Sequence, residues 1–239
     1  MIPSAPRRSY GERMIVAEDV LLLLTDDATG KAVVDGTRRD IAVAGAVIAE
    51  LAAAGRLEVA VSSGLFPRTT LRVVDPSPLG DDVLDDALVR AAGPGSASPT
   101  AVLGRIRKGL RERLYARLVA RGVLRAQEGR VLGVFPTASW PAVDATHEAE
   151  VLRSLHEVLV AGRAPTPREA SLVALLAAVD AVPKVRFGTG LPNRELKARA
   201  KQVAAGDVGG QAARKAVEAV EAAVMAGITA AGAAAASSG

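Results

Sequence analysis

Cationic side chains gather in the middle of the 239-residue chain, at a spacing suited to binding phosphate. Apolar residues recur every three or four positions between 103 and 118, which is typical of the buried face of a helix. At about 100° per residue, Arg107, Lys108 and Arg111 fall together on a neighbouring face. Two cations one turn apart can bind the same phosphate, to which an arginine donates two parallel N–H groups. The pattern predicts one continuous basic helix that ends at Gly122.

The charge of this segment stands out from that of the whole chain. The chain has 30 basic and 26 acidic residues and a formal net charge of +4. Between 105 and 121 there are seven Arg or Lys and one Glu, so this segment alone carries +6. A polyanionic partner on this face is one interpretation. The other is a solvated helix face, where arginine stems only cover apolar surface.

The sequence lacks the residue groupings that catalysis or metal binding needs. Cysteine is absent, and His147 and His156 are nine positions apart, which does not suit a shared metal ion on a helix. The segment 188–190 has two glycines but lacks the third glycine of a dinucleotide fingerprint. The acids of 81–86 are expected to be solvated residues of a first helical turn. We therefore expect no enzyme activity, no metal site and no cofactor.

Composition favours helices. Hydrophobic residues make up 49% of the chain and aromatic residues only 3%, so the core must consist of Ala, Val and Leu, which are inexpensive to hold in helices. The predicted fold class is mainly α: a single globular helical domain over 14–236 with short peripheral β-hairpins, between a flexible tail, 1–13, and a frayed end, 237–239. Further helices are expected at Val16–Leu24, Asp40–Ala54, Asp81–Ala92, Thr146–Ala161, Thr166–Ala181, Pro192–Ala205 and Gln211–Ala231.

Two hairpins and a short strand are expected beside these helices. Arg56–Val61 alternates and pairs with Thr69–Val74, and Val123–Ala126 pairs with Val131–Phe135 around a turn that contains Gly129. A short strand is also expected at Lys31–Val34. No signal peptide opens the chain, and the uncharged stretch near the carboxyl end is too short to cross a bilayer, so a cytoplasmic location is expected.

Several blocks of the sequence resemble the Golgi phosphoprotein 3 family, whose bacterial members are common in high-GC actinobacteria. The matching blocks run in family order and include two helices that end in glycine and lead into Arg-Leu or Val-Leu. They are Ala17–Lys31, Ala44–Val59, Leu79–Leu88, Arg107–Leu124 and, more weakly, Arg168–Val182. The resemblance implies a mostly helical single domain with short peripheral hairpins.

The resemblance also implies a ligand. Eukaryotic members lie on Golgi membranes, bind phosphatidylinositol 4-phosphate and deliver glycosyltransferases to the coatomer coat. Their headgroup pocket uses two arginines three residues apart, and these positions fall on Lys108 and Arg111. The pocket tryptophan and a further arginine fall at Asp35 and Ala44, so Arg38 and Arg39, which lie between them, are the candidates to compensate.

Apolar residues near the basic segment suggest two further roles. The hairpin after the basic helix corresponds to the family's oligomerisation hairpin, which implies burial against a partner chain in a homo-oligomer through Val131, Leu132, Val134 and Phe135. Leu65 and Phe66 lie in a loop and could insert into a membrane or pack down. Trp140, the single tryptophan, is expected to fill a core or an interface rather than anchor in lipid.

The leading hypothesis is a non-catalytic peripheral membrane protein on the inner face of the membrane. It binds an anionic, phosphoinositide-like headgroup through Arg107, Lys108 and Arg111. The alternatives are a winged-helix-like DNA-binding or regulatory protein, because two segments share a helix–glycine–strand order, and a structural cytoplasmic oligomer with a solvated basic face. Nucleic acid is the less favoured partner, because the net charge is modest.

Overall fold

The computed structural model describes residues 13–62, 68–93, 95–131, 135–185, 187–188, 190–205 and 224. Within them the chain is mainly helical with two small antiparallel sheets, which confirms the predicted fold class. The α-helices are α1 (Val16–Leu23), α2 (Gly36–Ala53), α3 (Asp82–Ala91), α4 (Pro99–Ile106), α5 (Leu110–Ala120), α6 (Thr146–Leu159), α7 (Pro167–Ala178) and α8 (Asn193–Ala204). A short 3₁₀ helix, η2 (Val182–Lys184), follows α7. The strands are β1 (Leu57–Val61), β2 (Thr69–Val73), β3 (Gln127–Val131) and β4 (Phe135–Ser139).

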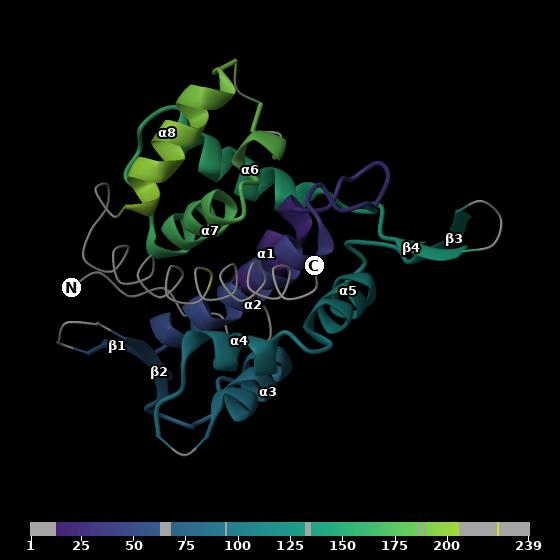
Figure 1. Ribbon diagram of the computed structural model, residues 1–239. Coiled ribbons are helices and arrows are strands. Elements are labelled where there is room, and N and C mark those ends of the chain that lie inside the picture. Colours follow the sequence, from purple (N-terminus) through teal and green to yellow (C-terminus); the bar gives the residue numbers. More distant parts are fainter. Residues whose placement is uncertain are drawn as a thin grey trace, which may run out of the picture.

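Helices α1 and α2 form the centre of the molecule. Figure 1 shows α6, α7 and α8 on one side of them, and α3, α4 and α5 on the other. Every residue of α1 is buried. Small side chains such as Ala42, Ala44 and Ala46 have no exposed surface in α2, so its neighbours can approach closely. The core is therefore built from Ala, Val and Leu, as the composition predicts.

Buried ion pairs join α1 to the helices around it. The Glu18 carboxylate has no exposed surface and accepts from Nε and Nη2 of Arg117 in α5, each at 2.9 Å. Asp19 accepts from Arg168 of α7, at 2.6 Å, and lies 2.7 Å from Nε2 of His147 in α6. Because a buried carboxylate must be paired, these contacts fix how α5, α6 and α7 lie against α1.

The predicted continuous basic helix is wrong. Gly109, with φ +71°, separates α4 from α5, and this left-handed conformation ends α4 because a residue with a Cβ adopts it only at a cost. The carbonyl of Lys108 in this turn accepts from Nη1 of Arg90 in α3, at 2.7 Å. Arg107 and Lys108 therefore lie on a turn between two short helices and not on a rigid rod.

The first hairpin is confirmed and the second lies elsewhere than predicted. Strands β1 and β2 pair from Leu57 opposite Val73. In the second hairpin, β3 and β4 pair with Gly129 opposite Thr137, so this glycine lies inside the ladder and not in the turn. Instead of pairing in this hairpin, Val123 accepts at its carbonyl a hydrogen bond from the N–H of Val143, at 2.8 Å. Between 31 and 34 the structure has an isolated bridge from Ala32 to Thr25 and no strand.

Some predictions fall on residues that the structure does not describe. These are the tail before Arg13, the Leu65–Phe66 pair and all of the last predicted helix except Val224. Among the described helices, none combines the length and the apolar character needed to cross a membrane.

Candidate anionic-ligand site

Most cations of the basic segment are bound by other parts of the protein. Nη1 of Arg117 lies 2.9 Å from Oδ1 of Asp81, in addition to the contacts of Arg117 with Glu18. Arg113 pairs with Asp86 at 2.5 Å and with Asp82 at 3.4 Å. Arg105 donates to the carbonyls that end α3, and Arg121 lies 3.6 Å from Glu18. The local charge of +6 is therefore largely neutralised within the fold.

Several partners of these arginines are acids that lie just before α3 or in its first turns. The sequence predicts that these acids are solvated, and this prediction is wrong for Asp81 and Asp85. Asp81 is buried and caps α3, because its side chain accepts from the N–H groups of Val83 and Leu84. Asp85 accepts from the N–H groups of Leu79 and Gly80. The doubled acids of the sequence stabilise the start of α3 and hold α5 against it.

Two cations remain exposed and have no ion pair within the described chain. Arg107 and Lys108 lie on the turn between α4 and α5, and both are exposed. Arg111 follows in the first turn of α5, where Nη1 lies 3.0 Å from Oδ1 of Asp40 and Nη2 contacts Glu112. Its side chain is 30% exposed, so it can also meet a ligand at the surface. Its two carboxylate partners partly neutralise its positive charge.

Arg39 reaches the same region from α2. Its Nη1 lies 3.4 Å from the hydroxyl of Tyr115, and its guanidinium lies 5.9 Å from the centre of the Tyr115 ring. The Nε group of Arg39 is buried and has no hydrogen-bond acceptor in the structure. A buried donor without an acceptor costs about 1–3 kcal/mol.

A stack of two aromatic rings supports Arg39. Tyr115 is buried, its hydroxyl lies 3.0 Å from that of Thr25, and its ring lies parallel to that of Trp140, with the centroids 3.9 Å apart. Trp140 is half-buried against the core, which agrees with the expectation that it fills a core or an interface. This stack could not be predicted from the sequence, because its two rings come from different elements and neither belongs to a recognisable motif.

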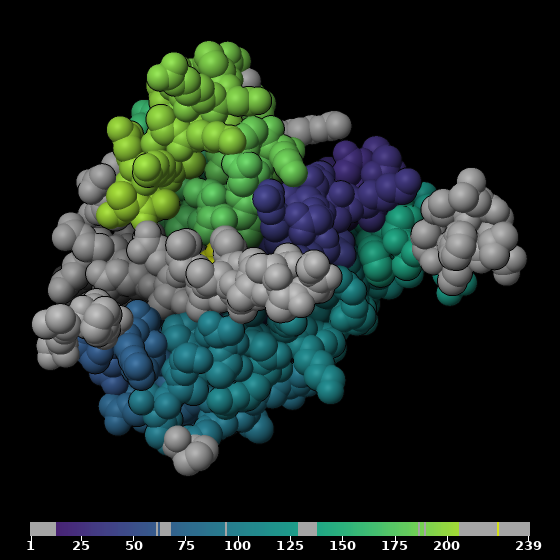
Figure 2. Space-filling model, viewed as in Figure 1, coloured from purple at the N-terminus to yellow at the C-terminus, as the bar shows by residue number. Residues whose placement is uncertain are grey.

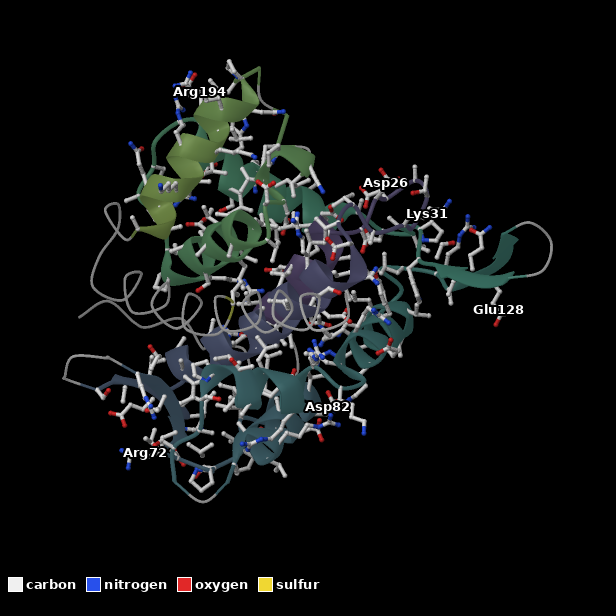
Figure 3. All side chains as sticks on the ribbon, viewed as in Figure 1. Asp26, Lys31, Arg72, Asp82, Glu128 and Arg194 are labelled. Carbon is white, nitrogen blue, oxygen red and sulfur yellow. The ribbon has the colours of Figure 1, made fainter. Side chains whose placement is uncertain are left out.

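Gly30 fixes the position of Trp140. Its carbonyl accepts from the N–H of Trp140 at 3.0 Å, and a Cβ at this position would lie 2.3 Å from the main-chain nitrogens of Trp140 and Pro141. Its φ of +65° also disfavours any side chain. Figure 3 shows the loop that contains Gly30, between the labelled Asp26 and Lys31, beside the base of the β3–β4 hairpin.

We predict that Gly30→Ala displaces Trp140 and lowers the free energy of unfolding by about 2–4 kcal/mol, because a backbone clash adds to the strain of a positive φ. Since Trp140 is the single tryptophan, its fluorescence reports the displacement directly. Gly55→Ala is the matched control: Gly55 has φ +71° but nothing within 4 Å of an added Cβ. Equal losses of stability and equal emission spectra for the two variants would contradict the assigned role of Gly30.

The remaining predicted residues do not join this site. Arg38 pairs with Asp35 at 3.3 Å, and no contact of Arg38 with Arg111 or Tyr115 is found in the described chain. Asp35, at the tryptophan position of the resemblance, is the N-cap of α2, and Ala44, at the arginine position, is fully buried. Of the two candidates for compensation, Arg39 contacts Tyr115 of α5, and no such contact of Arg38 is found in the described chain.

The oligomerisation hairpin stays a prediction. Val131 ends β3, Phe135 begins β4, and the two lie opposite each other in the ladder. Leu132 and Val134 lie outside the described residues, as do the side chains of the other two.

His147 and His156 are half-buried. His147 pairs with Asp19, which raises the pKa of its imidazole, and Nδ1 of His156 lies 2.9 Å from the carbonyl of Phe187. Within the described ranges, no group of three or more His, Asp or Glu side chains has the arrangement of a metal site. The chemistry that the site offers is therefore charge and hydrogen-bond donation to an anion.

Comparison with protein families gives a match. The family model described as Golgi phosphoprotein 3 (GPP34) matches residues 16–220, which is most of the chain and includes every residue of the site. None of the curated proteins matches the sequence.

Proposed function

The chain belongs to the Golgi phosphoprotein 3 (GPP34) family, and on that premise we propose that it is a peripheral membrane protein that binds an anionic phospholipid headgroup. The proposed site consists of Arg107, Lys108, Arg111 and Arg39. It differs from the site expected from the sequence in one respect, since Arg39 alone supplies the contribution of α2.

One observation carries the proposal: three of the four cations of this site, all except Arg111, have at least one donor group without an acceptor in the described chain. Arg107 and Lys108 are exposed without an ion pair in the described chain, and the buried Nε of Arg39 has no acceptor. Elsewhere in the basic segment the guanidinium groups are paired. A phosphate would meet two exposed cations that no group of the described chain neutralises.

The pairing of the other arginines of the basic segment argues against a long polyanion as the ligand. A protein that coats duplex DNA needs many unneutralised cations, each of which adds to the salt dependence of binding. Here Asp40 and Glu112 already hold Arg111. Each cation near an anionic surface contributes about 1 kcal/mol, so binding is expected to be weak, salt-sensitive and limited to one or two headgroups.

Co-sedimentation with vesicles at low salt tests the proposal. We predict that vesicles containing phosphatidylinositol 4-phosphate or cardiolipin bind the protein and that phosphatidylcholine vesicles do not. Arg107→Glu/Lys108→Glu should lower binding at least tenfold, because two attractive charges become repulsive. These exposed side chains support no other element, so the melting temperature should stay within a few degrees of the parent protein.

The matched control is Arg68→Glu/Arg72→Glu, which reverses two exposed charges at the β1–β2 hairpin. Figure 3 shows Arg72 at the edge of this hairpin. Loss of binding in this control, or full binding by Arg107→Glu/Lys108→Glu, would refute the site. Binding to duplex DNA with a steep salt dependence and no binding to vesicles would support the winged-helix-like alternative instead.

A further inference from the structure

A second group of cations surrounds Asp180, in the turn that follows α7. Nζ of Lys197 in α8 lies 2.8 Å from Oδ1 of Asp180. Arg38 of α2 and Lys184 of η2 act on the same carboxylate, and with the hydrogen bond from Lys197, which contributes most, they lower the pKa of Asp180. Lys197 therefore pairs with Asp180 directly, and Arg38 of the distant α2 and Lys184 of the neighbouring η2 act on it through their charges.

Asp180 is an unusual centre for such a group. Its side chain is 60% exposed, and its φ of +55° is left-handed, which no other non-glycine residue of the described chain shares. This conformation is unfavourable for an L residue, although aspartate and asparagine tolerate it best. The chain thus holds one exposed carboxylate among three cations, of which Arg38 is also paired with Asp35.

The surrounding sequence is strongly basic. From 180 to 205 there are six basic and two acidic residues, a net charge of +4 that equals that of the whole chain. One of the two acids is Asp180, and the other, Glu195, is paired with Arg199 at 2.6 Å. Figure 2 shows the yellow-green surface of α8 at one end of the molecule and the teal surface of α3 and α4 at the other.

Helix α2 connects this group to the proposed headgroup site. Consecutive residues of a helix point about 100° apart, so Arg38 and Arg39 leave α2 in different directions. Arg39 contacts Tyr115, next to α5, whereas Arg38 acts on Asp180, next to α8. The two groups of cations therefore lie on either side of the first turn of α2.

We propose that Arg38, Lys184 and Lys197, here called the Asp180 cluster, form a second contact with an anionic bilayer and bind the phosphate of a second phospholipid. This inference rests on the proposed function for the bilayer but uses different residues. Two linked contacts bind far more tightly than either alone, because the second forms at a high effective concentration. Asp180 occupies the place of the phosphate in the free protein and competes with it.

The competition by Asp180 gives a test that structural damage cannot imitate. Asp180→Asn removes the competing charge and suits a left-handed φ, so we expect binding to phosphatidylglycerol vesicles at low salt to rise about fivefold. Lys184→Gln/Lys197→Gln should lower it about tenfold.

Arg194→Gln/Lys201→Gln is the matched control, because both residues are exposed on α8 and lie outside the cluster. Figure 3 shows Arg194 at the outer end of α8. This control should bind almost as the parent protein does, and inorganic phosphate at matched ionic strength should not displace the vesicles.

The outcomes separate the two proposals. If Asp180→Asn binds no better than the parent, or if the control loses as much as Lys184→Gln/Lys197→Gln, the Asp180 cluster is not a contact and only net charge matters. If Arg107→Glu/Lys108→Glu abolishes binding while all variants of the cluster match the parent, the headgroup site stands and this inference fails. If the cluster variants change binding in the expected directions and Arg107→Glu/Lys108→Glu does not, the Asp180 cluster stands as a contact and the proposed headgroup site fails. Failure of the parent to bind any anionic vesicle at low salt would overturn both.

Discussion

Arg117→Met should lower the free energy of unfolding by about 3–5 kcal/mol, the range found when one partner of a buried ion pair is removed. Arg117 donates to both carboxylate oxygens of Glu18, which has no exposed surface, and to the buried Asp81. Methionine fills the space of the stem but leaves Asp81 without a cation in the described chain and Glu18 with only Arg121, 3.6 Å away. Chemical denaturation at neutral pH, followed by circular dichroism, measures the loss.

Arg113→Met is the matched control for Arg117→Met. Arg113 lies one helical turn earlier on α5 and also pairs with two carboxylates, but its partners Asp82 and Asp86 are 72% and 38% exposed. Water can solvate these carboxylates after the substitution, so the expected loss is about 1 kcal/mol or less. Equal losses in the two variants would show that burial of Glu18 does not set the value of the Arg117 contacts.

The contrast between Arg113 and Arg117 also shows what the sequence could predict. The helical spacing of apolar residues identified the helices, because one face of each must be buried whatever its neighbours are. The same pattern could not distinguish the cations that pair with carboxylates within the fold from those that are exposed to a ligand. Arg117 meets Glu18 across 99 residues and Arg111 meets Asp40 across 71, and such pairings depend on how the helices pack.

Local geometry explains the other differences. Gly109 interrupts the basic helix, but a glycine inside a helical pattern is often tolerated, so the apolar period alone gave no reason to place a break there. The period did place Arg107 and Lys108 away from the buried face, and they are exposed. Arg39 was a candidate only through the family resemblance. Its role depends on Tyr115 and Trp140, which the sequence does not bring together.

A second large effect is expected from Glu148, at the start of α6. The residue is 8% exposed. Burial, followed by the neighbouring Asp27 and Asp26, raises the pKa of its carboxyl group to about 8, from an ordinary value of 4.5. The neutral form is therefore the one that the folded protein favours. The stabilisation from this group is fully present below pH 4.5 and is lost as the pH rises through 8.

Glu148→Gln should therefore stabilise the protein above neutral pH. Glutamine keeps the shape of the protonated carboxyl group and can donate a hydrogen bond to Asp27, but it never ionises. We expect the free energy of unfolding at pH 8 to rise by about 3 kcal/mol, with little change near pH 4.5, because each unit of pKa difference corresponds to about 1.4 kcal/mol and residual solvation reduces the total.

Glu150→Gln is the control for this prediction, since Glu150 lies two residues further along α6 and is exposed. Its expected effect is about 0.5 kcal/mol or less at either pH, as for most surface substitutions. Denaturation of both variants at the two pH values separates local burial from a general reduction of negative charge. A gain for Glu148→Gln that is equal at both pH values, or shared by Glu150→Gln, would mean that Glu148 ionises normally.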